Sequence, residues 1–263
     1  MSEFQRGDVE RGMLQEELMD TKSVDEFYTV ANPILGVDWE GHTPEAYTSD
    51  YAIAQPEKTK IFVFRDPDSH EIVAGGKAAI IEESEVEDYF RLPPHFSNKK
   101  GVVFEYAFVK SDARGKNLHR ELLKKRNEWA SAIGADYVCV ELSTENPRAI
   151  NVQLRDKDNP FILVSVFPPS HGMPDNYLVG VRPVEYTDEA KWRELQLPIP
   201  SDLAPVTEVS IKKYEWREVP LNSSIEELNG LFKEGWVGVD IKYDVNSSQD
   251  NISSGYLIFE RTK

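Results

Sequence analysis

Cysteine is nearly absent from this sequence: Cys139 is the only thiol in 263 residues. A single cysteine excludes a disulfide within the chain and the paired thiolates of zinc fingers and ribbons. The five histidines are scattered and lack the close spacing of metal-ligand pairs. We therefore expect no metal site. Cys139 lies in an apolar run, which favours a buried structural residue over a catalytic nucleophile.

Long apolar runs are also missing. No stretch is apolar enough for a secretory signal peptide or for a helix that spans a membrane. Neither the P-loop of nucleotide hydrolases nor the Gly-x-Ser-x-Gly elbow of serine hydrolases occurs. The sequence therefore predicts a cytoplasmic protein with no membrane contact, and it gives no support to either hydrolase class.

Basic residues are scarce overall, since 30 Lys and Arg stand against 46 Asp and Glu, a net charge of −16. This balance disfavours binding to nucleic acid. The exception is the segment 110–126, whose local positive charge favours a polyanionic ligand. The alternative for residues 120–126 is the solvated face of an amphipathic helix. The basic residues of this segment are Lys110, Arg114, Lys116, Arg120, Lys124, Lys125 and Arg126.

What the sequence does contain is a strand, a turn and a helix in succession. Residues 102–109 are nearly all apolar, as in a strand covered on both faces, and Glu105 is their one ionisable residue. From Lys116 onward, apolar residues recur at helical spacing up to Gly134, which suits a helix C-terminus. Backbone N–H groups at such a helix start form an anion site. Cations there, as at Arg114 and Lys116, are unfavourable unless an anion binds.

A second strand and a second helix follow. Residues 136–142 form a short run rich in β-branched residues, and Asn146 is suited to cap a helix whose first position is Pro147. The order strand, helix, strand, helix places the anion site beside the end of a parallel-type strand. Folds that bind phosphorylated cofactors have this arrangement.

Residues 114–119, Arg-Gly-Lys-Asn-Leu-His, resemble the cofactor motif Arg/Gln-x-x-Gly-x-Gly/Ala of the GCN5-related N-acetyltransferase (GNAT) family. A second element of that family, Asn-x-x-Ala, matches residues 146–149, and the resemblance covers about residues 23–182. Asn117 and His119 replace glycine or a small residue, and asparagine is the least costly replacement where an unusual backbone dihedral is required. Gln153 stands where members often carry the tyrosine that protonates the leaving thiolate.

The resemblance implies an enzyme that moves an acyl group, most often acetyl, from acetyl-CoA to a primary amine by direct attack. Such an enzyme needs a base, because the amine must be neutral to attack, and Glu105 is the best candidate, on the strand that would run beside the thioester. The alternative for Glu105 is a structural carboxylate that bonds neighbouring backbone or pairs with a cation. Main-chain N–H groups at or near Val109 would polarise the thioester carbonyl, and those of residues 114–118 would hold the pyrophosphate. The implied cofactor-binding residues are Val109, Arg114, Gly115, Lys116, Asn117, Leu118, His119 and Asn146.

The sequence does not identify the acceptor. Its acidic balance favours a cationic amine, such as a polyamine, an aminoglycoside or a lysine-bearing peptide, although net negative charge also serves solubility alone. The alternative function is a catalytically silent acyl-CoA-binding sensor or interaction module on the same fold. The replacements at Asn117, His119 and Gln153 favour it. A homo-oligomer is left open.

A hairpin is predicted before the first of these strands. Residues 60–65 and 71–81 are strand-like, and the turn formers of 66–70 join them. Gly75 and Gly76 inside the second run predict a bulge, since no helix follows them as it would in a phosphate loop.

Two further segments complete this part of the chain. Ser23 with Glu26 three positions later has the pattern of a capping box, which predicts a helix from Ser23 through Val30. The segment 82–101 is longer than a simple connection and carries several aromatic residues. It either lines the site or forms a surface insertion with a short helix.

We expect four parts: a polar N-terminal extension (1–22), a GNAT-like acyl-CoA-binding domain (23–182), a proline-containing linker (183–205) and a small C-terminal domain (206–263). The expected fold class is α/β, with a mixed, twisted central sheet flanked by helices, as the resemblance implies. The C-terminal domain is predicted to read strand, helix, strand, strand.

The C-terminal part resembles a small bacterial domain of unknown function. Its core pattern, Leu-Asn-x-Leu-x-x-Glu-Gly-Trp, matches residues 228–236. Ser224 is predicted to begin the helix of this part and Gly235 to end it. Phe232 and Trp236 are expected to be core residues. No activity follows from this second resemblance.

Overall fold

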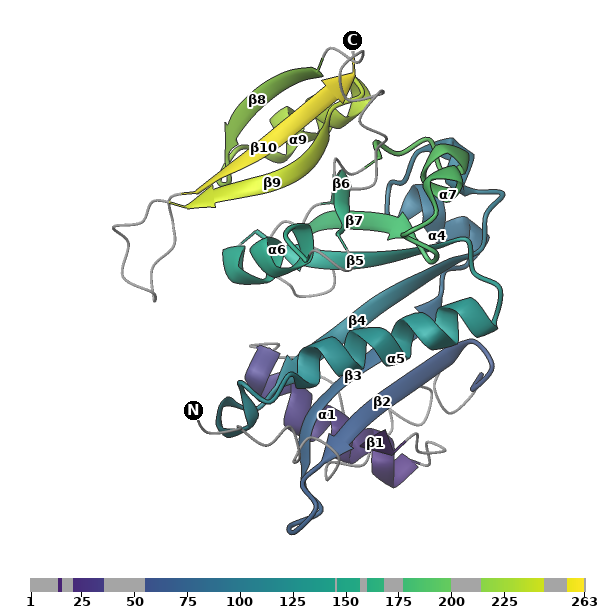
Figure 1. The fold of residues 1–263 in the computed structure, drawn as a ribbon, viewed down its shortest axis with the longest axis vertical. Helices are drawn as coiled ribbons and strands as arrows, with labels where there is room; N and C mark the ends of the chain where they lie inside the picture. The colour runs from purple at the N-terminus through teal and green to yellow at the C-terminus, as the bar shows by residue number, and fades with distance from the viewer. Residues whose placement is uncertain are drawn as a thin grey trace, which may run out of the picture. The chain divides into compact units, whose positions relative to one another are not determined.

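The computed structural model describes residues 14–15, 21–35, 55–144, 146–156, 160–167, 177–199, 214–243 and 255–262. The chain divides into two compact units. The first unit combines Met1–Ile80 with Phe104–Ala132, and the second combines Ile81–Val103 with Ile133–Lys263. Figure 1 shows the elements of both units. The division falls within strand β4 (Gly101–Val109), so β4 begins in the second unit and ends in the first.

The first unit is a sheet with a long helix on each face. Its sheet order is β1-β2-β3-β4, and both β1 with β2 and β2 with β3 are antiparallel. Figure 1 shows α5 in front of the strands and α1 behind them. The predicted hairpin is confirmed, because β2 and β3 pair along their whole length. The elements besides β4 are β1 (Leu14–Gln15), α1 (Thr21–Leu35), β2 (Thr59–Arg65), β3 (Ile72–Ile80), a short 3₁₀ turn (Ser111–Ala113) and α5 (Leu118–Ala132).

Two adjacent glycines in β3 let both helices pack closely on the sheet. A Cβ atom on Gly75 would lie 2.9 Å from the ring of Phe27 on α1, and one on Gly76 would lie 3.0 Å from Leu122 on α5. Both glycines pair regularly with β2, and the irregularity of the register lies between Phe64 and Arg65. The predicted bulge at the glycines is therefore wrong. Glycine stands there because helices cover the strand from both sides.

Helix α1 buries one face against this sheet. Val24, Phe27, Tyr28 and Ala31 point into the core, at the spacing of a single helical stripe. The helix begins at Thr21, so Ser23 lies inside it and the predicted capping box is wrong. Glu26 pairs instead with Arg65 of β2, with Nη1 2.7 Å from Oε1.

The second unit contains a sheet in the order β5-β7-β6-β9-β10-β8. Every pair recorded in it is antiparallel. Its strands are β5 (Tyr137–Ser143), β6 (Ile162–Phe167), β7 (Tyr177–Pro183), β8 (Tyr214–Pro220), β9 (Val237–Tyr243) and β10 (Gly255–Thr262). Its helices are α4 (Glu83–Asp88), a 3₁₀ turn (Pro94–Phe96), α6 (Pro147–Leu154), α7 (Glu189–Glu194) and α9 (Ile225–Lys233). The predicted α/β class with helices flanking a sheet is confirmed.

The long connection 82–101 packs into the second unit. It forms α4 and the 3₁₀ turn, and it buries Phe90 and Phe96. The carbonyl oxygen of Phe90 accepts a hydrogen bond of 2.7 Å from Ser165 of β6. The predicted short helix is present, and these aromatic residues belong to the core of the unit.

The C-terminal segment has the predicted order strand, helix, strand, strand. Ser224 caps α9 by accepting a hydrogen bond from Glu227 N at 3.2 Å, and Gly235 follows the helix with φ +80°. Trp236 is buried, and the Phe232 ring packs on Phe259 with centroids 5.4 Å apart. Trp236 is thus a core residue, as expected, whereas Phe232 is only half-buried.

The domain boundaries stay a prediction. Strand β9 pairs with β6 at Gly238 and Leu163, so the C-terminal segment continues the sheet of its unit. Most of the predicted N-terminal extension and the end of the predicted linker, residues 200–205, lie outside the described residues.

Gly101 provides a test of packing in the second unit. A Cβ atom there would meet the ring of the fully buried Tyr137, with Cε2 at 2.7 Å. We expect Gly101→Ala to lower the free energy of unfolding by about 1–3 kcal/mol, because a full core has no room for the methyl group. Urea unfolding followed by circular dichroism measures the change.

The matched control is Gly230→Ala in α9, where a Cβ atom would meet nothing within 4 Å. That change should stabilise the chain by about 0.5–1 kcal/mol, because alanine favours a helix interior. Equal stability of Gly101→Ala and the wild type would contradict the packing described for Tyr137.

Candidate functional site

The candidate site is built on the end of β4, the turn after it and the start of α5. Lys110 leaves the strand, the 3₁₀ turn over Ser111–Ala113 reverses the chain, and α5 begins at Leu118. Residues 114–117 are all exposed. The predicted strand, cationic turn and helix are therefore present in this order.

Two residues of the turn have left-handed backbone conformations. Gly115 has φ +81° and Asn117 has φ +60°. A Cβ atom on Gly115 would meet nothing within 4 Å, so the space beside the turn is open. Asparagine tolerates this conformation better than other residues with a side chain. The reason predicted for Asn117, a backbone that glycine or asparagine adopts, is confirmed.

The turn leaves backbone donors without partners. The Asn117 carbonyl oxygen accepts hydrogen bonds from Arg120 N at 3.1 Å and Glu121 N at 3.2 Å, which starts the helix. Within the described part of the chain, the N–H groups of residues 115–118 donate no hydrogen bond. Unbonded N–H groups at a helix start, beside the positive end of the helix dipole, form a site for an anion.

Exposed cations surround these donors. Arg114, Lys116 and Arg120 are all exposed. The pKa of Asp66 in the β2–β3 turn is lowered by hydrogen bonds from the backbone N–H of Ser69 and of Asp68, and to a smaller degree by the charge of Lys116. The positive charge predicted for this segment therefore lies around the turn.

Arg126 fits neither prediction for the basic segment, the anion site or the solvated helix face. It is only 1% exposed, and its guanidinium lies over the Phe104 ring, 4.6 Å from the centroid. Its Nη1 donates to the carbonyl oxygens of Lys77 and Glu105, each at 3.4 Å. The residue is thus neither part of a solvated face nor available to a ligand at the turn. Lys124 is exposed, and Lys125 pairs with Glu128 at 3.0 Å, as the solvated-face reading predicts for those two.

Glu105 is half-buried in β4 and pairs with a cation. Its Oε2 lies 3.4 Å from Nζ of Lys77 on β3. The next residue, Tyr106, has φ +53°, an unusual value for a large side chain inside a strand. Such outliers collect at functional sites. The pairing matches the alternative prediction for Glu105, a structural carboxylate that pairs with a cation. The strained residue beside it is the feature that favours a functional site.

Lys77 and Tyr106 were missed in the sequence. Lys77 is the one charged residue inside the apolar run 72–80, as Glu105 is inside 102–109. Two lone, opposite charges in neighbouring apolar strands indicate a pair. That signal was available before the structure.

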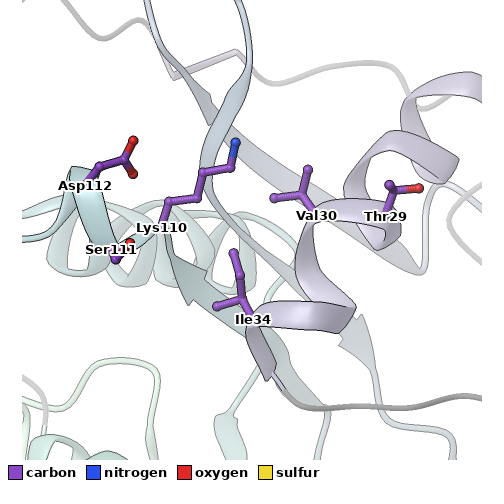
Figure 2. Close-up of a pocket in the computed structure, with 6 residues that line it drawn as sticks. All are labelled: Thr29, Val30, Ile34, Lys110, Ser111 and Asp112. Atoms are coloured by element: carbon purple, nitrogen blue, oxygen red, sulfur yellow. The ribbon is translucent and has the colours of Figure 1, made fainter.

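A hollow of about 550 Å³ lies between α1 and the end of β4. Figure 2 shows Val30 and Ile34 of α1 on one side and Lys110 on the other. Lys110 directly follows Val109, and its Nζ lies 3.4 Å from Oε2 of Glu71. The hollow combines an apolar wall with polar groups next to the turn. Its lining residues are Thr29, Val30, Ile34, Lys110, Ser111 and Asp112.

The remaining predicted residues fall in different places. Val109 is half-buried at the end of β4, and His119 is half-buried in the first turn of α5. Asn146 belongs to the second unit, where it caps α6 by accepting a hydrogen bond from Ala149 N at 3.1 Å, as predicted. Gln153 of α6 is buried, and its Oε1 accepts no hydrogen bond from the described residues.

The described residues contain no group of three or more His, Cys, Asp or Glu side chains arranged to hold a metal ion. None of the helices described has both the length and the apolar character required to cross a bilayer.

Comparison with known proteins gives structural similarity alone. No family model matches the sequence. No curated protein matches it either.

Among solved structures, the NatC complex bound to Gag peptide and CoA is similar at 15% identity, with 65% of this chain and 97% of that chain covered and a TM-score of 0.47. The ribosomal-protein-S18-alanine N-acetyltransferase from Escherichia coli gives 13% identity, 65% and 94% coverage and a TM-score of 0.46. The ribosomal-protein-S5-alanine acetyltransferase from Vibrio fischeri gives 14% identity, 64% and 92% coverage and a TM-score of 0.45.

The left-handed turn gives a direct test of the anion site. Asn117→Gly should preserve it, because glycine adopts φ +60° without strain. Asn117→Val should weaken the binding of acetyl-CoA about tenfold or more, because a β-branched residue loses roughly 1–2 kcal/mol in this conformation and moves the N–H donors. Isothermal titration calorimetry measures both.

Gly134→Val is the matched control, since Gly134 also has a positive φ, +71°, and a Cβ atom there would meet nothing within 4 Å. It places similar strain at the other end of α5 and should leave the affinity unchanged. Wild-type affinity in Asn117→Val would show that the turn does not hold the ligand.

Proposed function

We propose that the protein is an acyl-CoA-dependent N-acyltransferase that moves an acyl group, most simply acetyl, from CoA to a primary amine. The observation that carries this proposal is the open turn at residues 114–118, at the end of the strand that holds Glu105. Arg114 N–H donates to Ser111 O, whereas the N–H groups of residues 115–118 donate no hydrogen bond within the described part of the chain, and exposed cations stand beside them. An anion site and a carboxylate on one strand are the two parts that such a reaction requires.

The turn suits the pyrophosphate of CoA. The N–H groups of residues 115–118 lie just before and at the start of α5, and Arg114 and Lys116 add positive charge. Glu105 lies four residues before Val109, so an elongated ligand lying along β4 covers about 13 Å between strand end and carboxylate. A pantetheine arm is elongated in this way. The donors and cations of the turn, together with this length along β4, support acyl-CoA over a compact anion.

Glu105 would act as the general base. Its carboxylate takes a proton from the amine, the amine nitrogen forms a bond to the acyl carbon, and the carbon–sulfur bond breaks to release CoA thiolate. Backbone N–H groups at or near Val109 would donate to the carbonyl oxygen as negative charge develops. No covalent intermediate on the protein is required. The group that protonates the thiolate is unassigned, because Gln153 replaces the tyrosine of the family pattern.

The acceptor we infer is a cationic amine, and the compartment we infer is the cytoplasm. The net charge of −16 supports a cationic acceptor. A single buried cysteine supports a reducing compartment.

The second candidate is a silent acyl-CoA sensor on the same fold. The pairing of Glu105 with Lys77 favours it, because a carboxylate that only neutralises a cation takes no part in catalysis. Both candidates bind acyl-CoA, so turnover separates them.

Glu105→Gln separates them in practice. The amide keeps the shape of the side chain but accepts no proton, so we expect the release of free thiol from acetyl-CoA with a panel of amines to fall about 100-fold or more. Acetyl-CoA affinity measured by calorimetry should change little. Glu128→Gln on α5, whose ion pair with Lys125 is exposed, is the control and should keep full activity.

Turnover that survives Glu105→Gln would remove the general-base role. Binding without turnover in the wild type, across polyamines, aminoglycosides and lysine peptides, would favour the sensor.

A further inference from the structure

The apolar strand β3 holds one lysine, its neighbour β4 holds one glutamate, and the two side chains meet. Nζ of Lys77 lies 3.4 Å from Oε2 of Glu105, and their side chains are 14% and 24% exposed. We propose that Lys77 is a positioning residue for Glu105: its ammonium group holds one carboxylate oxygen so that the other, Oε1, accepts the proton of the amine. This inference rests on the proposed N-acyltransferase function.

The strand geometry puts both residues on the face away from α5. A Cβ atom on Gly76 would touch Leu122 and Arg126 of α5, so the neighbouring Lys77 points to the opposite face. The Phe104 ring likewise lies against Arg126, so Glu105 also points away from α5. The pair therefore forms on the α1 side of the sheet.

The buried Arg126 fixes the backbone beneath this pair. One guanidinium nitrogen, Nη1, donates to the carbonyl oxygens of both Lys77 and Glu105. A single side chain of α5 thus ties together the two residues whose side chains meet on the other face. The backbone positions do not depend on the ion pair, so removal of the Lys77 side chain leaves the strands in place.

Tyr106 holds the ammonium group from a second side. Nζ of Lys77 lies 5.7 Å from the centre of the Tyr106 ring, within the range of a cation–π interaction. That ring packs edge to face on Tyr28 of α1, with centroids 5.4 Å apart. The positive φ of Tyr106 interrupts the alternation of β4 and brings its ring to the same face as Glu105. The strained residue therefore has a role in building the pair.

The cation holds the carboxylate in one orientation. Without it the Glu105 side chain is free to adopt other rotamers, which moves Oε1 away from the amine. Among the described residues, the charged and titratable groups that face the pair are Tyr106 of β4, Tyr28 of α1 and, through the backbone, Arg126 of α5. Glu26 of α1 pairs with Arg65. Lys77 is thus the cation that acts directly on Glu105.

The kinetic test compares Lys77→Met, Lys77→Arg and a control. We expect Lys77→Met to lower kcat about 10- to 100-fold with the KM for acetyl-CoA within about twofold, because the base is misplaced while the turn that holds CoA is intact. Lys77→Arg should restore most of the rate.

Arg65→Met is the matched control, because Arg65 is 15% exposed and its partner Glu26 lies in the same unit. It removes a similar ion pair outside the site and should leave kcat unchanged. An equal loss of rate in Arg65→Met, or a wild-type rate in Lys77→Met, would overturn the inference.

Two further measurements test the inference, and the second does not depend on the proposed function. In the double variant Lys77→Met/Glu105→Gln, the loss of kcat should equal that of Glu105→Gln alone, because Lys77 acts only through Glu105. The second measurement is ¹³C NMR of the glutamate carboxyl groups at one fixed pH, with Glu105→Gln for assignment, which requires no turnover. The chemical shift of the Glu105 carboxyl carbon should change in Lys77→Met, because the carboxylate loses its cation, and stay in place in Arg65→Met.

Outcomes of these experiments separate the two claims. An inactive wild type, with the changed carboxyl chemical shift in Lys77→Met, overturns the transferase and with it the catalytic purpose of the pair. An active enzyme in which the effects of the two changes multiply, or in which the carboxyl chemical shift of Lys77→Met is unchanged, overturns the positioning role alone.

Discussion

The structure of the candidate site depends on one backbone constraint, the left-handed turn between β4 and α5. With φ +81° at Gly115 and +60° at Asn117, the chain enters the helix with the N–H groups of residues 115–118 unbonded within the described part. These donors favour an anion, and the exposed cations beside them add to the attraction. Helix α5 then carries Arg126 back to the middle of β4, so one element links the anion site to Glu105.

Close packing on both faces of β3 makes that link possible. The absence of side chains at Gly75 and Gly76 lets α1 and α5 approach, and Arg126 reaches the carbonyl oxygens of two strands through this narrow gap. A buried guanidinium costs free energy unless dipoles or charges surround it, and the two carbonyl oxygens and the Phe104 ring supply them. The same packing leaves the other face of the sheet to the pair of Lys77 and Glu105, whose side chains are partly exposed.

Local chemistry explains which features the sequence could predict. The turn at Asn117, the caps at Asn146 and Ser224, and the glycine after α9 depend on a few neighbouring residues, and each agrees with the structure. The explanation of Gly75 and Gly76, the burial of Arg126 and the partner of Glu105 depend on side chains 20 to 50 positions away. A pattern along one segment does not contain the register of strands or the helix that covers them. The start of α1 was missed because Ser23 and Glu26 have a capping pattern that the fold does not use.

Binding of acetyl-CoA observed residue by residue tests the central claim most directly. In ¹H–¹⁵N NMR spectra recorded during a titration with acetyl-CoA, the backbone amides of residues 115–118 should show the largest downfield shifts, because they gain hydrogen bonds to phosphate oxygens. CoA without its acyl group should give the same shifts there, since the diphosphate is common to both. Unchanged amides at the turn, with bound ligand detected elsewhere or none bound, would contradict the account.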